Sequence, residues 1–134
     1  MKLIWIDHFD EELHEQLFDL YKGEWWTKGR SKQDVISAFE NSDIVIGCLS
    51  DDGKLLACAR ILSDFTFKAF IFDVIIQIDV RGKGLGAAII DKIRTHDRLQ
   101  NVKSFELYCP DQLVPFYQKL GFDESSSHLL KWMR

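Results

Sequence analysis

The spacing of apolar residues predicts two helices in the first third of the chain. The first begins after Asp10, whose side chain suits a helix N-cap, and ends near Tyr21. The second begins after Ser31, where Asp34 three residues later resembles a capping box. In both, apolar residues lie three and four positions apart and share one face. These residues are Leu13, Leu17, Leu20 and Tyr21 in the first helix, and Val35, Ile36 and Phe39 in the second.

Apolar runs predict the strands of a sheet. Residues 44–49 and 55–62 are separated by Asp51-Asp52-Gly53, a turn signal that indicates a hairpin. The run from 67 to 79 is longer and almost continuously apolar at its centre, which favours burial on both faces, with helices above and below the sheet. The other expected strands are residues 2–6, 104–109 and 128–133.

Two further helices are expected over residues 84–98 and 112–120. The resulting order of elements predicts an α+β fold: a mixed, mostly antiparallel, twisted sheet with helices on both faces. With 134 residues and 46% hydrophobic residues, the chain suits one domain over residues 1–134.

Charge and composition exclude several classes of partner. The net charge of −4 does not suit nucleic acid. No apolar run is long enough to span a bilayer, and the amino end lacks a signal-peptide pattern, so we expect no membrane partner and a cytoplasmic protein. The three cysteines form no C-x-x-C pair and the four histidines are scattered, so no metal site is expected.

The main chemical feature is the loop Arg81-Gly82-Lys83-Gly84-Leu85-Gly86 between the long strand and a helix. A helix N-terminus offers unpaired backbone N–H groups, and glycines let an anion approach them closely. Arg81 and Lys83 add positive charge. The loop therefore favours phosphate binding over a plain turn.

A dinucleotide is one phosphate ligand that fits the loop by residue type alone. Gly82, Gly84 and Ala87 match a dinucleotide fingerprint, and Glu106 lies about 20 residues on, where a ribose-binding acid is expected. However, that fingerprint belongs after the first strand of a repeated β-α-β series, whereas here an antiparallel meander precedes the loop.

The loop and a second motif resemble the GNAT acetyltransferase superfamily. Arg81 to Gly86 fits the acyl-CoA motif Arg/Gln-x-x-Gly-x-Gly/Ala, and Tyr117-Gln118-Lys119-Leu120-Gly121-Phe122 is similar to the family's later tyrosine signature. The order of elements agrees along essentially the whole chain. Two positions depart from the family: Ile78 replaces a frequent proline, and Pro110 replaces a frequent asparagine that contacts the cofactor.

The resemblance implies a fold, a cofactor and its binding residues. It implies acetyl-CoA with its pyrophosphate held by the loop, and its pantetheine arm paired with the backbone at the end of the long strand, in a gap opened by a bulge. The implied cofactor-binding residues are Val74, Ile76, Ile78, Arg81, Gly82, Lys83, Gly84, Leu85, Gly86 and Ala87.

Acetyl transfer to an amine needs a proton donor for the leaving thiolate and a group that keeps the amine neutral. Tyr117 matches the family's donor position. Asp73 lies inside an apolar strand, so it is either a base or the partner of Arg60 or Lys68 in an ion pair; Glu24 is a second candidate base.

The resemblance implies that the acceptor wall lies in the loop between the first two helices, which holds Glu24, Trp25, Trp26 and Arg30. The two tryptophans either pack against a cationic or aromatic amine, or one belongs to the core and the other to the edge of a lid. The sequence thus predicts an N-acetyltransferase that acts directly on a small-molecule or peptide amine. A non-catalytic CoA-binding regulator and a dinucleotide-binding module remain alternatives, and a homodimer through paired strands is left open.

Overall fold

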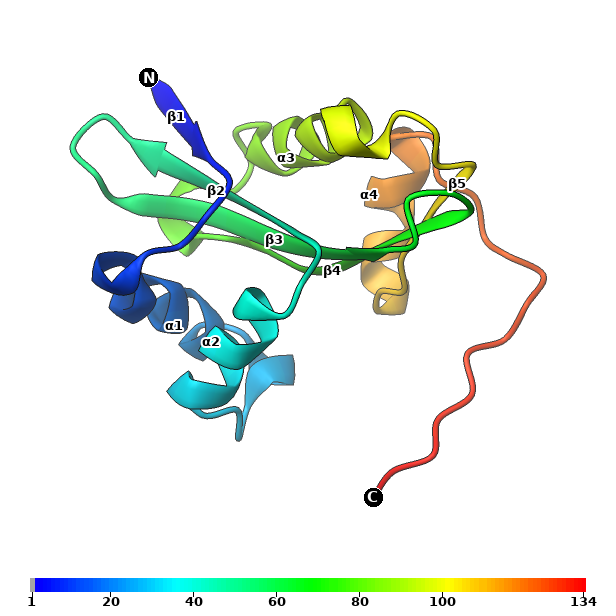
Figure 1. Ribbon diagram of the computed structural model, residues 1–134, viewed down its shortest axis with the longest axis horizontal. Coiled ribbons are helices and arrows are strands. Elements are labelled where there is room, and N and C mark those ends of the chain that lie inside the picture. The colour runs from blue at the N-terminus through cyan, green and yellow to red at the C-terminus, as the bar shows by residue number, and fades with distance from the viewer. Residues whose placement is uncertain (1) are drawn as a thin grey trace.

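A five-stranded sheet forms the centre of the computed structural model, which describes residues 2–134 (Figure 1). The strands lie in chain order, and β1 to β4 form an antiparallel meander, as predicted. Only β5 runs parallel to its neighbour, β4. The strands are β1 (Leu3–Ile6), β2 (Ile44–Ser50), β3 (Leu55–Ser63), β4 (Lys68–Ile76) and β5 (Ser104–Glu106).

The two predicted N-caps form in the first helices. The Asp10 side chain accepts from the N–H of Leu13 at a 3₁₀ turn that leads into α1 (His14–Lys22). The Ser31 hydroxyl accepts from the N–H of Asp34 at 3.1 Å at the start of α2 (Lys32–Glu40). These bonds satisfy backbone donors that a helix start leaves free.

Helices cover both faces of the sheet, as expected (Figure 1). On one face, α1 and α2 pack with β2, β3 and β4 around Leu17, Tyr21 and Phe39. On the other face, α3 (Leu85–Arg94) and α4 (Val114–Lys119) pack around Ile89, Ile90 and Tyr117. None of the helices in the described residues is long and apolar enough to cross a membrane.

Several elements are shorter than the sequence predicts, and three of them end at least three residues early. The strand β4 ends at Ile76 rather than 79, because a 3₁₀ turn over Ile78–Val80 leads into the glycine loop. The helix α3 ends at Arg94 rather than 98, and a separate 3₁₀ turn then buries Leu99. Only the first three of residues 104–109 pair in β5, because β4 and β5 then separate.

The predicted last strand, residues 128–133, is wrong. These residues form no regular structure and extend away from the body of the molecule (Figure 1). A strand requires a neighbouring ladder of hydrogen bonds, and a pattern of apolar residues does not supply one.

A β-bulge interrupts β4 at its centre. Cys58 lies opposite Ile75 and Arg60 lies opposite Phe72, so Ala59 alone faces the two residues Asp73 and Val74. Asp73 has a φ of 55°, in the left-handed region. The bulge positions the functional site, because bulges bend a strand and redirect its side chains.

Candidate active site

The glycine loop is open towards solvent where it begins α3. Gly82 and Gly84 have φ values of 77° and 85°, a conformation that side chains rarely adopt. A Cβ added at either position would meet no heavy atom within 4 Å. The surrounding structure therefore leaves room for a ligand directly against the backbone.

The start of α3 offers hydrogen-bond donors to such a ligand. In its first backbone hydrogen bond, the N–H of Ala88 donates to the carbonyl of Gly84 at 3.0 Å. Among residues 2–134, no protein group accepts from the N–H groups of Leu85, Gly86 and Ala87. These donors, the positive end of the helix dipole and the exposed Lys83 fit the pyrophosphate of a coenzyme A.

Gly86 differs from Gly82 and Gly84, because it packs against a neighbouring helix instead of facing open space. A Cβ at Gly86 would lie 3.0 Å from the ring of Phe116 on α4. The absence of a side chain thus lets α4 approach α3 closely, which places Tyr117 near the loop.

Arg81 links the loop to the acceptor segment. Its Nε donates to the carbonyl of Ile76 at 2.9 Å, and its guanidinium forms an ion pair with the carboxylate of Glu24. The Glu24 side chain is only 16% exposed. The half-buried carboxylate of Glu24 therefore joins the glycine loop to the loop between α1 and α2, the candidate acceptor wall.

The strands β4 and β5 separate after a short stretch of pairing. Their parallel pairing ends at Phe70 opposite Glu106, and the bulge at Asp73 follows directly. Beyond that point, Val74 and Ile76 lie on β4 without a β5 partner, while Ile78 is exposed in the following turn.

Asp73 is a buried acceptor for three side chains. Its Oδ2 accepts from Tyr21 Oη at 2.7 Å, Arg60 Nε at 2.8 Å and Arg30 at 3.2 Å. The Asp73 side chain is 7% exposed. The structure thus shows the ion pair with Arg60 that the sequence left open, whereas Lys68 pairs with Glu106 instead. One carboxylate oxygen therefore accepts from three side chains, two of which are guanidinium groups.

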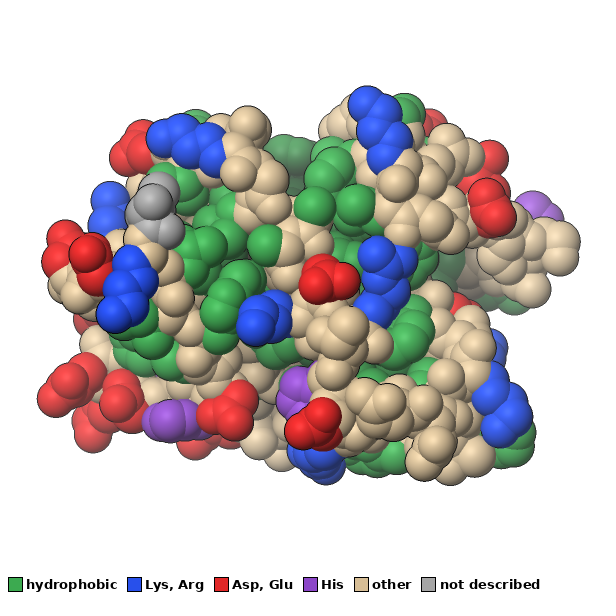
Figure 2. Space-filling view, turned by 90° about the horizontal axis from the view of Figure 1, so that it is seen from above, with side chains coloured by type: hydrophobic (Ala, Val, Ile, Leu, Met, Phe, Trp, Pro, Cys, Tyr) green, Lys and Arg blue, Asp and Glu red, His purple; other side chains and the backbone are tan. Residues whose placement is uncertain are grey.

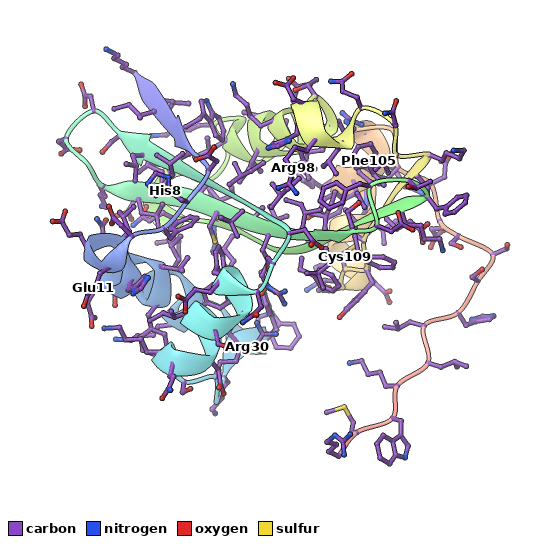
Figure 3. The ribbon with its side chains drawn as sticks, in the orientation of Figure 1. His8, Glu11, Arg30, Arg98, Phe105 and Cys109 are labelled. Atoms are coloured by element: carbon purple, nitrogen blue, oxygen red, sulfur yellow. The ribbon has the colours of Figure 1, made fainter. Side chains whose placement is uncertain are left out.

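The loop between α1 and α2 forms an aromatic and charged wall beside this cluster. The guanidinium of Arg30 lies over the rings of Trp26 and Tyr21, at 5.4 and 5.8 Å from their centroids. In Figure 3, Arg30 lies with α2 on the lower side of the sheet. Trp26 packs inward, while Trp25 is 71% exposed at the rim of a cavity of about 460 Å³. Glu24, Trp25 and Arg30 all line this cavity.

Tyr117 lies on α4 at the other side of the separated strands. Phe116 and Phe122 hold its ring by edge-on contacts at 5.0 and 5.9 Å. Burial, and then the nearby thiol of Cys109, raise the pKa of Tyr117 to about 12. A phenol with this pKa keeps its proton at neutral pH and can donate it.

The sequence did not indicate Tyr21 as a site residue. In the sequence, Tyr21 is one more apolar position on the first helix. In the structure, its hydroxyl donates a hydrogen bond to Asp73, 52 residues later. The only available signal was Asp73 itself, since a carboxylate in an apolar strand requires donors. Burial of the Tyr21 hydroxyl, with Asp73 and the Cys58 thiol nearby, raises its pKa far above the usual range.

Sequence comparison assigns this arrangement to a family. The profile of the Acetyltransferase (GNAT) family matches residues 6–122, which include the loop, the bulge and Tyr117. The chain belongs to this family.

The relatives of known sequence include two that are named for different acceptors, serotonin and histone. The chain is 36% identical over 100 residues to the uncharacterised N-acetyltransferase ycf52 of Pyropia yezoensis, covering 72% of this chain and 57% of that protein. It is 31% identical over 96 residues to serotonin N-acetyltransferase 2, chloroplastic, of Oryza sativa subsp. japonica (69% and 48%). It is 34% identical over 74 residues to histone acetyltransferase TAP1 of Glycine max (55% and 30%). The chain thus spans about half the length of these relatives or less.

Solved structures share the fold. A candidate acetyltransferase from Deinococcus radiodurans R1 superposes with a TM-score of 0.82 at 22% identity, covering 96% of this chain and 87% of that one. A predicted acetyltransferase from Clostridium acetobutylicum, solved with acetyl-CoA, gives 0.75 at 17% identity, covering 97% and 96%. At these identities the likeness establishes the fold alone.

Proposed function

We propose that the chain transfers the acetyl group of acetyl-CoA directly to a primary amine. The observation that carries this proposal is the open glycine loop at the start of α3, against which α4 packs through Phe116, the neighbour of Tyr117. Membership of the acetyltransferase family supports it. When bound, acetyl-CoA supplies the activated acetyl group as a thioester.

The residues proposed to hold the cofactor divide into two groups. The backbone N–H groups from Gly82 to Ala87, with Lys83, bind the pyrophosphate. Backbone groups of β4 at Val74 and Ile76, and of Ile78 after it, pair with the pantetheine arm in the gap, as a strand pairs with a sheet edge.

Tyr117 is proposed to give its proton to the leaving thiolate. As the amine nitrogen bonds to the carbonyl carbon, the carbon–sulfur bond breaks and the sulfur needs a proton. The position of Tyr117 supports this role, because the neighbouring Phe116 packs against Gly86 of the loop and the phenol is protonated at neutral pH.

Glu24 fits the task of binding and deprotonating the acceptor ammonium better than Asp73 does. The carboxylate of Asp73 already accepts from Tyr21, Arg60 and Arg30, so its role is to fix the bulge and the wall. Glu24 lines the cavity beside Trp25, and its single charged partner, among the residues described, is Arg81.

The acceptor is proposed to be a small aromatic or a peptide amine. Trp25, Tyr21 and Phe18 provide an aromatic lining beside the Glu24 carboxylate. Two of the relatives are named for serotonin and for histone, which represent these two classes. The cytoplasmic location stays a prediction, since the serotonin enzyme is named as chloroplastic.

The cofactor is tested by thermal unfolding with a panel of acetyl-CoA, NAD, NADP and ATP. The proposal predicts an increase in Tm with acetyl-CoA alone. A dinucleotide-binding module predicts the increase with NAD or NADP, but its expected ribose ligand, Glu106, already pairs with Lys68 at 3.3 Å. No increase with acetyl-CoA would contradict the proposal.

The variant Tyr117→Phe distinguishes the hypothesis of an enzyme from that of a non-catalytic CoA-binding regulator. In Tyr117→Phe the rate of transfer should fall by about 10²–10⁴-fold while affinity for CoA is kept. The matched control is Tyr108→Phe, which alters an exposed tyrosine and should leave both unchanged. A regulator would show no transfer in either variant or in the parent chain.

A further inference from the structure

The cavity beside the candidate acceptor wall carries more positive charge than negative. Its charged lining residues are Lys22, Lys28, Arg30 and Glu24. The whole chain has a net charge of −4, so this positive excess is local. On the face across the sheet from the cavity, acidic and basic side chains are interspersed instead (Figure 2). A local excess of one sign suits a ligand that carries a group of the opposite sign.

Ion pairs among residues 2–134 neutralise only part of this charge. Lys22 pairs with Asp19 on its own helix at 3.4 Å, and Glu24 pairs with Arg81. These two pairs leave no net charge. Lys28 has no ion pair with any of the described residues. Its ammonium group is therefore free to bind a ligand.

Arg30 has a fixed position and free donors. Its Nη1 donates to Asp73 at 3.2 Å, and its guanidinium lies over the ring of Trp26. Asp73 also pairs with Arg60, so one negative charge serves two guanidinium groups. A guanidinium has five N–H donors, and no group in the described part of the chain accepts from the others on Arg30. Such a group can bind a carboxylate through two parallel hydrogen bonds.

The turn between these two cations adds a backbone donor. Lys28 and Gly29 are its central residues, and the N–H of Arg30 closes it on the carbonyl of Thr27 at 3.0 Å. Within the residues that the structure describes, no group accepts from the N–H of Gly29. A Cβ at Gly29 would meet no heavy atom within 4 Å, so a ligand can approach this backbone closely.

Given the proposed acetyl transfer, on which this inference rests, we propose that the acceptor is a free aromatic amino acid. Its carboxylate binds to Arg30 and Lys28, its ammonium group faces Glu24, and its ring packs against the exposed Trp25. The cavity of about 460 Å³ suits a small molecule of this kind. An amine without a carboxylate, or a lysine side chain within a peptide, would leave the two cations without an anion.

Two acceptors that differ only in the carboxylate test this assignment. We compare kcat/KM for acetyl transfer to tryptophan and to tryptamine. Tryptophan should be preferred by about tenfold or more, because its carboxylate accepts hydrogen bonds from charged donors. A preference for tryptamine would overturn the inference and leave the proposed function intact. Absence of transfer to any amine would instead contradict the proposed function itself, and this inference with it.

Variants of the two cations assign the preference to these residues. Lys28→Gln should lower the ratio of the two kcat/KM values by about threefold or more, whereas Lys28→Arg should keep it. Arg30→Lys keeps the charge but loses the fork of donors, so the ratio should fall here too. The control Lys103→Gln changes an exposed lysine that does not line the cavity, and should leave the ratio unchanged.

The ratio is the decisive quantity, because the same two acceptors are compared in every variant and the difference between their amine pKa values cancels. A ratio that stays the same in both Lys28→Gln and Arg30→Lys would overturn the proposal. So would an equal fall in Lys103→Gln.

Discussion

Nε of Arg60 donates to Oδ2 of Asp73 at 2.8 Å, across the bulge that bends β4. Asp73 holds a positive φ that is unusual for any residue but glycine, although Asp adopts it more readily than most. Tyr21 and Arg30 bind the same oxygen, so one carboxylate connects the sheet, α1 and the acceptor wall. The geometry of the gap between β4 and β5 therefore depends on a charge cluster as well as on the backbone.

Asp73→Asn should destabilise the protein by about 3 kcal/mol, because it leaves the half-buried guanidinium of Arg60 without its counter-charge. Urea unfolding measures this change. The control Asp91→Asn removes an exposed charge on α3 and should change the free energy of unfolding by less than about 0.5 kcal/mol. Equal effects of the two substitutions would show that the cluster does not hold the bulge.

Gly84→Ala should abolish acetyl-CoA binding for a reason other than strain. Gly53, in the turn between β2 and β3, has the same φ of 85° and the same open surroundings. Both alanine variants should therefore lose about 1–2 kcal/mol of stability from the left-handed backbone. Only Gly84→Ala places a methyl group where the pyrophosphate should lie, so only this variant should lose affinity in a calorimetric titration. Comparable affinity in both variants would place the pyrophosphate elsewhere.

Glu24→Gln should reduce the rate of acetyl transfer and shift its pH dependence to higher pH, because the amine then has to lose its proton to solvent. The expected loss is about 10²-fold or more near neutral pH. The control Glu15→Gln also removes a carboxylate from an ion pair between separate elements, with Lys32, but far from the loop. It should leave the pH–rate profile unchanged. A profile that moves equally in both variants would argue against a specific role of Glu24.

Tyr117 should make stability fall at high pH. Its pKa is about 12 in the folded protein and about 10 in an unfolded chain. Below pH 10 the phenol is protonated in both states, so its contribution is constant. Between about pH 10 and 12 only the unfolded state loses the proton, so unfolding becomes easier as pH rises. The free energy of unfolding of the parent chain minus that of Tyr117→Phe should decline over this window. A flat difference would show that the tyrosine is not held protonated.

The sequence correctly predicted the features that depend only on residues close together in the chain. Asp10 and Ser31 cap the helices expected of them, because a cap depends only on residues a few positions away. The glycine loop was predicted for the same reason, since its glycines and the following helix are adjacent in the chain.

Features that depend on distant partners could not be predicted in the same way. The hydrogen bond to Asp73 comes from Tyr21 on α1, 52 residues earlier in the chain, and nothing in the sequence near Tyr21 indicates it. The pair between Arg81 and Glu24 likewise joins residues 57 positions apart. The tail at 128–133 has the composition of a strand, but strand formation depends on a neighbouring edge that composition does not specify.

The central claim is acetyl transfer from acetyl-CoA to an amine, and mass spectrometry of the acceptor tests it most directly. The chain is incubated with acetyl-CoA and a panel of aromatic amines and lysine peptides, with Tyr117→Phe in parallel. We predict an acetyl group on the nitrogen of at least one amine, matched by release of free CoA thiol and strongly slowed in the variant. Acetyl-CoA binding without transfer to any amine, or transfer that is equally fast in Tyr117→Phe, would contradict the account.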